Sequence, residues 1–262
     1  MENNKLPIKE IFHESITLVK NNYKALFKAA ILYIIIGLII NIYDYMYLDL
    51  ENFVLDIPSL ILTALLWFTF ILTSVRFHRI FLLSEMDNSS FLKWSTIESK
   101  FFGRWIVIIL SSGLIATPVL IIFSFFSISY GYEETDSILG IIMMIPMYYF
   151  ISRFSLVLPA TAINDKENSL KWSWNLSKGN AIRLFLLLTA LPILPMAFFT
   201  FLPVLENIGY SLISIILTIL ILPFEICFLS LSYKFLMEAH NQNPEEEIIN
   251  ESSNDIIVNN SI

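Results

Sequence analysis

One acidic residue stands inside a long apolar segment near the C-terminus. It is Glu225, in "ILPFEICFLS", nine residues before Lys234. Nine residues of helix rise about 13 Å, which would place Glu225 near the middle of a bilayer. A carboxylate at that depth is costly, and by default it marks a pathway, a proton relay or a ligand site. The alternative, which we favour slightly, is a structural role, in which a protonated Glu225 hydrogen-bonds a neighbouring helix beside Pro223. A proton relay usually needs a second buried ionisable group.

Basic and aromatic residues near the predicted membrane surface form a second group of candidates. Arg153 precedes "FSLVLPATAIND" and has three possible roles: it binds a lipid phosphate, pairs with Asp165, or snorkels to the interface, and we favour the last. The segment "NSLKWSWNLSKGN" places lysines and tryptophans side by side, a composition typical of membrane interfaces. The candidate contacts to lipid headgroups or to a partner are Arg153, Lys171, Trp172, Trp174 and Lys178.

The other residue types that carry chemistry are scattered. His13, His78 and His240 fall in predicted cytoplasmic segments without metal-ligand spacing, and the single cysteine, Cys227, lies in an apolar run. We find no nucleophile elbow, phosphate-binding glycine loop or paired carboxylates. Basic residues alternate with aromatics near the membrane, which indicates anionic lipid rather than nucleic acid. We therefore expect no enzymatic activity, no metal and no cofactor.

The composition predicts that these residues are positioned by membrane helices. Of the 262 residues, 56% are hydrophobic and 15% charged, whereas soluble domains have about a quarter charged. A helix needs about 20 apolar residues to cross a bilayer. Strands are excluded, because open strands in lipid leave backbone groups unpaired. The predicted fold is all-α and polytopic, with six transmembrane helices near 25–43, 58–75, 105–130, 137–158, 184–205 and 208–233.

The basic residues predict the orientation of these helices, because cytoplasmic loops carry an excess of Lys and Arg. All 16 Lys and Arg residues lie around the start of span one, between spans two and three, around the link from span four to five, or at the end of span six. The connections around 44–57, 131–136 and 206–207 have none. We expect a multi-pass protein of the bacterial cytoplasmic (inner) membrane with both termini in the cytoplasm.

The chain also shows signs of an internal repeat. "LKWS" occurs at Leu92–Ser95 and again at Leu170–Ser173, and each copy reaches a lysine five residues after its serine. The N-terminal segment has the same Ser15-to-Lys20 spacing. This pattern predicts three tandem units, each a cytoplasmic interfacial helix followed by a transmembrane hairpin. In the third copy, Gly179 would end the interfacial helix.

The last residues differ in composition from the rest. The stretch "NQNPEEEIINESSNDIIVNNSI" is polar, acidic and rich in turn-forming residues. Such a composition buries too little apolar surface to fold alone. We therefore divide the chain into a six-helix membrane domain at 1–240 and a disordered acidic cytoplasmic tail at 241–262.

The stretch "LVLPATAINDKENSLKWSWNLSKGNAIRLF" resembles a region of uncharacterised six-span bacterial inner-membrane proteins. These are related to the membrane domain joined to some glycerophosphodiester phosphodiesterases. That region has a proline near the end of span four, an acidic residue, and a Ser…Leu…Asn helix before span five. The family has no assigned chemistry, and no phosphodiesterase domain is present here. The matching positions are Pro159, Asp165, Ser173, Leu176 and Asn180.

Two functions are compatible with these features. The first is a non-enzymatic accessory or envelope-maintenance module, which acts through the phospholipid bilayer or through a membrane-protein partner. The second is a small permease or exporter of an amphipathic solute, with a cavity near Glu225. We favour the first, because a membrane fold does not by itself imply transport. The oligomeric state is left open.

Overall fold

The computed structural model describes residues 5–47, 57–85, 93–129, 137–190 and 208–242. Every regular element within these ranges is a helix, so the predicted all-α class is confirmed. Six spans and three tandem units are not confirmed. The tail from residue 243 and the connections at 131–136 and 206–207 lie outside the described residues, as does most of 184–205.

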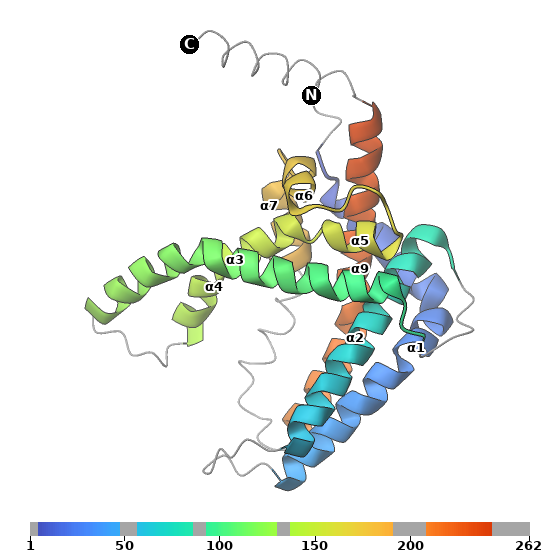
Figure 1. The fold of residues 1–262 in the computed structure, drawn as a ribbon, viewed down its shortest axis with the longest axis vertical. Helices are drawn as coiled ribbons and strands as arrows, with labels where there is room; N and C mark the ends of the chain where they lie inside the picture. The colour runs from blue at the N-terminus through green and yellow to red at the C-terminus, as the bar shows by residue number, and fades with distance from the viewer. Residues whose placement is uncertain (1–4, 48–56, 86–92, 130–136, 191–207, 243–262) are drawn as a thin grey trace.

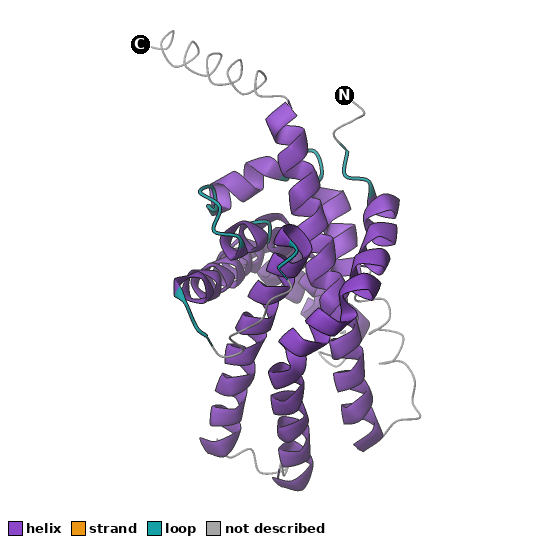
Figure 2. Ribbon diagram, turned by 90° about the vertical axis from the view of Figure 1, so that its right-hand side faces the viewer, coloured by secondary structure: helices purple, strands orange, loops and turns teal. Residues whose placement is uncertain are grey.

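Three long helices pack together over much of their length. They are α1 (Ile8–Tyr47), α2 (Ile57–Leu83) and α9 (Ile208–Gln242), and each contacts the other two. Figures 1 and 2 show them as the long axis of the molecule, with the start of α1 and the end of α9 at the same end. We refer to these three helices as the long bundle.

The helix α3 (Thr96–Ser129) has a different direction. Figure 1 shows it running across the long bundle, where the six-span prediction would have it run alongside. It packs against α4 (Ser137–Phe154) and the short α5 (Val157–Ala162). Sequence patterns cannot detect such a crossing, because hydropathy measures how apolar a helix is and not where it points.

Short helices cover the end of the long bundle that holds the start of α1. They are α6 (Leu170–Leu176), α7 (Ala181–Phe185) and the π-helix η1 (Leu186–Ala190). The side chain of Ser169 caps α6 by accepting from the backbone N–H of Trp172. Gly179 has a φ of +83°, a left-handed conformation that glycine adopts at little cost, and it turns the chain between α6 and α7.

The three predicted interfacial segments do not have a common structure. The first is continuous with the apolar part of α1 in one helix of 40 residues, and the second continues from Thr96 into α3. Only the third, within the described ranges, forms a separate short helix, α6. The first segment has no glycine or proline between Ile8 and residue 36, whereas the third is followed by Gly179 in a left-handed conformation.

Four helices in the described residues are long and apolar enough to cross a membrane: Ile8–Tyr43, Ile57–Leu83, Thr96–Ile122 and Leu217–Asn241. This supports a membrane protein. The 40 residues of α1 extend about 60 Å, roughly twice the hydrocarbon thickness, so a large part of this helix would project beyond the bilayer.

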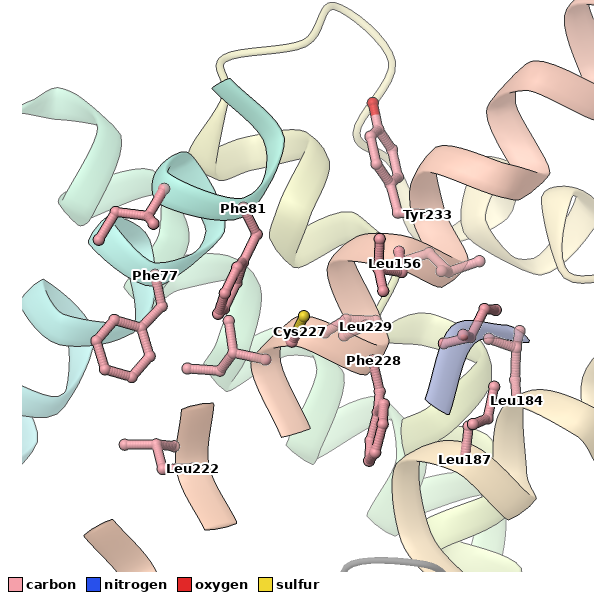
Figure 3. Packing of buried hydrophobic residues seen from close by; sticks show 14 of the residues in the cluster. Phe77, Phe81, Leu156, Leu184, Leu187, Leu222, Cys227, Phe228, Leu229 and Tyr233 are labelled. Atoms are coloured by element: carbon pink, nitrogen blue, oxygen red, sulfur yellow. The ribbon is translucent and has the colours of Figure 1, made fainter. Parts of the chain in front are cut away.

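The largest cluster of buried side chains joins the long bundle to the short helices. Figure 3 shows Phe77 and Phe81 of α2 beside the segment of α9 that carries Leu222 and Cys227. Leu184 and Leu187, from α7 and η1, join the same cluster. This packing fixes α2 and α9 relative to each other, and both helices contribute to the cavity described next.

Candidate functional site

A cavity of about 350 Å³ lies among α2, α3, α4, η1 and α9. We call it the central cavity. Its size falls within the usual range for ligand pockets, roughly 300–1,000 Å³. Most of its wall is apolar, and the polar or titratable lining residues are Ser74, His78, Trp105, Tyr148, Ser152, Ser155, Thr189 and Glu225. An apolar wall with a few polar groups is typical of small-molecule sites.

Glu225 lies at the midpoint of α9 and lines the central cavity. Its carboxyl group makes no hydrogen bond or ion pair with the residues that the structure describes. Tyr33 on α1 is close enough to interact with it electrostatically. A structural role for Glu225 would require a hydrogen bond to a neighbouring helix, and the described residues do not provide one. The carboxyl group can therefore bind a ligand in the central cavity.

His78 lines the same cavity, and sequence reasoning missed it. The side chain is 1% exposed, and its Nδ1 lies 2.8 Å from the hydroxyl oxygen of Ser230 on α9. The hydroxyl of Ser230 is also within hydrogen-bond distance of the carbonyl of Ile226. The single hydroxyl hydrogen of Ser230 can go either to the carbonyl of Ile226 or to Nδ1, and the tautomer of His78 follows from which of the two it bonds.

The position of His78 had a signal in the sequence. Helical spacing puts His78 on the same face of α2 as Ile71 and Ser74, while Arg76 and Arg79 fall on other faces. The predicted second span ends at residue 75, so His78 falls in a predicted cytoplasmic loop and this helical pattern is not extended to it. The helix continues to Leu83 and carries His78 into the packed interior.

Three serines also belong to the polar part of the wall. Ser74 lies one turn before His78 on α2, is 3% exposed, and its hydroxyl has no hydrogen-bond partner in the structure. This hydroxyl can therefore bond a ligand that enters the cavity. Ser152 and Ser155 instead donate to the carbonyls of Tyr149 and Ser152.

Arg153 is turned into the protein. Its guanidinium donates from Nε to Ser177 Oγ at 2.9 Å and from an η-nitrogen to the Trp174 carbonyl at 2.6 Å. The guanidinium carbon also lies 3.3 Å from the centroid of the Trp174 ring. The backbone carbonyl of Arg153 accepts from Ser173 Oγ. Arg153 and Trp174 thus join the end of α4 to α6, and the guanidinium of Arg153 is buried by these contacts.

The other predicted contacts are divided between interior and surface. Lys171 and Lys178 are exposed, so they stay available to headgroups or partners. Trp172 is half-buried and packs against the ring of Tyr233, with the centroids 6.1 Å apart. Asp165 accepts a hydrogen bond from the hydroxyl of Tyr233, so its partner is a tyrosine on α9.

The five positions of the family resemblance all lie in the α5–α7 region. Asn180 Oδ1 accepts from the backbone N–H of Leu6 at 2.7 Å, which ties this region to the start of α1. The hydrogen bonds of Asp165 and Ser173 tie it to α9 and α4. Leu176 packs in the main core cluster, and Pro159 is buried within α5. These residues position the short helices, and none of the five lines the central cavity.

Metal-ligating residues do not gather in the part of the chain that the structure describes. No three His, Cys, Asp or Glu side chains there are placed to hold one ion. Cys227 is buried in the main core cluster. The function that the described residues support is therefore the binding of a small molecule in the central cavity.

The chain was compared with protein-family models, curated proteins and solved structures, and none of them matches it.

Proposed function

We propose that this protein is a small membrane carrier, a permease or exporter, which binds an amphipathic solute in the central cavity. The observation that carries the proposal is Glu225: a carboxyl group at the midpoint of a long apolar helix that faces a cavity and has no hydrogen-bond partner among the described residues. An intramembrane acidic residue in that position marks a substrate or ion pathway by default.

The shape and wall of the central cavity support this proposal. Its apolar surface would hold the hydrophobic body of a solute, and its few polar groups would fix the head. One wall comes from η1, a π-helix, and such elements occur often at functional sites. Pro146 lies inside α4 and Pro223 inside α9, so two wall helices carry residues that bend helices.

The proposed setting is the bacterial cytoplasmic membrane, with both termini in the cytoplasm. The start of α1 and the end of α9 lie at one end of the long bundle (Figures 1 and 2). Lys9 and Lys20 on α1 and Lys234 on α9 lie in the parts of these helices nearest that end. An excess of basic residues at one end of a bundle favours the cytoplasmic side.

An accessory or envelope-maintenance role is the second candidate. It is favoured by the outward-facing apolar side chains of α3, where Leu110, Leu114 and Phe125 are all more than 60% exposed. Apolar patches of this kind bind lipid or a partner protein. This role needs no solute movement, so a transport measurement separates the two candidates.

The experiment uses purified full-length protein in liposomes of phosphatidylethanolamine and phosphatidylglycerol. Three probes share a phenyl body and differ in the head: phenyltrimethylammonium, benzenesulfonate and phenyl glucoside. We expect at least one to cross faster than in empty liposomes. The Glu225→Gln variant should lose this flux, while the control Glu238→Gln should keep it, because Glu238 is exposed on the same helix outside the cavity. Folded protein that moves none of the probes would overturn the carrier proposal and leave the accessory role.

A further inference from the structure

We infer that the solute of the central cavity is an organic cation, with an amine or quaternary ammonium head beside Glu225 and an apolar body against aromatic side chains. This inference rests on the proposed carrier function and names its substrate class. It follows from three properties of the cavity wall: its charge, its hydrogen-bonding capacity and its aromatic rings.

The charge of the wall is the first property. Glu225 is the one acidic residue that lines the central cavity, and no Lys or Arg lines it among the described residues. The arginines nearest in sequence to the lining residues have other partners: Arg79 pairs with Glu85, Arg104 donates to Asn168, and Arg153 binds Trp174 and Ser177. Arg76 is half-buried and interacts electrostatically with Glu98. A bound anion would face a carboxyl group with no compensating cation, whereas a bound cation would receive a counter-ion.

Hydrogen-bonding capacity is the second property. The hydroxyl groups of Ser152 and Ser155 donate to backbone carbonyls, so each hydroxyl oxygen can accept a hydrogen bond from a ligand. Ser74 has a free hydroxyl and can accept as well. The carboxylate of Glu225 and the hydroxyl oxygens of these serines are acceptors, and they suit a ligand whose head donates hydrogen bonds, as a protonated amine does.

Aromatic rings are the third property. Phe70, Phe101, Trp105 and Tyr148 line the central cavity from α2, α3 and α4. The faces of aromatic rings are negative and attract ammonium groups, most strongly where water is excluded. The same rings pack well against an apolar body. The cavity therefore combines a counter-ion with aromatic faces, a combination found in sites for quaternary ammonium ligands.

The test measures binding of the same three probes to purified full-length protein in detergent, by the change in tryptophan emission, to which Trp105 contributes. Phenyltrimethylammonium should bind at least about tenfold more tightly than benzenesulfonate or phenyl glucoside, the scale expected for a desolvated charge pair. The Glu225→Gln variant should lose about that factor for the cation alone. Glu238→Gln should bind like the unmodified chain.

A charge-conserving variant shows that the loss comes from charge and not from misfolding. Glu225→Asp should retain the preference for the cation, and both Glu225 variants should unfold at temperatures close to the unmodified chain. Equal binding of all three probes, or undiminished cation binding by Glu225→Gln, would overturn the cation inference and leave the carrier proposal standing. Absence of both binding and flux for every probe would overturn the carrier proposal itself.

Discussion

The Nδ1 atom of His78 on α2 lies 2.8 Å from the hydroxyl oxygen of Ser230 on α9. The two residues are 152 positions apart in the chain, and their hydrogen bond joins two helices of the long bundle beside the central cavity. It holds the imidazole ring in place between the two helices. A small change at Ser230 should therefore affect both the packing of the bundle and the polarity of the cavity.

Replacing Ser230 with Ala should destabilise the protein by about 1–3 kcal/mol, because the buried Nδ1 of His78 would lose its partner. Thermal unfolding in detergent, followed by circular dichroism, measures the effect. Thr17→Ala is the matched control: its hydroxyl is exposed and bonds the carbonyl four residues earlier, so its loss should change stability by less than about 0.5 kcal/mol. Equal effects from the two variants would argue against the His78–Ser230 contact.

Binding of phenyltrimethylammonium should weaken as the pH falls, because protons compete with the cation for the carboxylate of Glu225. Where the carboxyl group is mostly protonated, the apparent affinity should drop by about tenfold per pH unit. The titratable groups around Glu225 are Tyr33 on α1, His78 on α2 and Tyr148 on α4. Titrations of Glu225→Gln isolate the part due to His78, whose protonation would also repel a cation. A pH profile identical in Glu225→Gln and the unmodified chain would contradict the role of the carboxylate.

Replacing Arg153 with Ala should destabilise the protein by about 3 kcal/mol, because the variant loses two charged hydrogen bonds and a cation–π contact with Trp174. Arg153→Lys should restore only part of the stability, since an ammonium cannot reproduce the planar two-point geometry. The exposed Lys178→Ala is the control and should stay within about 0.5 kcal/mol. An Arg153→Ala variant as stable as this control would favour the snorkelling role predicted from the sequence.

The proposed orientation can be measured with single cysteines in a Cys227→Ser background. Met46→Cys at the end of α1 should react with an impermeant maleimide added to intact cells, because the connection after α1 has no basic residues. Lys93→Cys, before α3, should react only after the cells are opened. Both side chains are exposed on the protein surface, so accessibility differs by membrane side alone. The reverse labelling pattern would invert the orientation.

Glu225 and His78 both line the cavity, but only Glu225 can be predicted as a site residue from the local sequence. Glu225 was found because a carboxyl group in an apolar run is conspicuous in any fold. His78 was missed because it lies between two arginines, and only the packing of α9 against α2 buries it. Arg153 shows the same limit: its sequence environment suggests a membrane surface, while the fold of α6 brings Trp174 and Ser177 to it.

The sequence by itself determined the helical class, the apolar character of the long helices and the place of Glu225 inside one of them, because all three depend on composition and on the apolar period along single helices. Only the tertiary structure decided that α3 crosses the long bundle, that the first interfacial segment is continuous with α1, and that His78, Ser74 and Glu225 share one cavity. These relationships depend on which helix faces pack together, and the apolar residues on one face of a helix do not specify which other helix will pack against it.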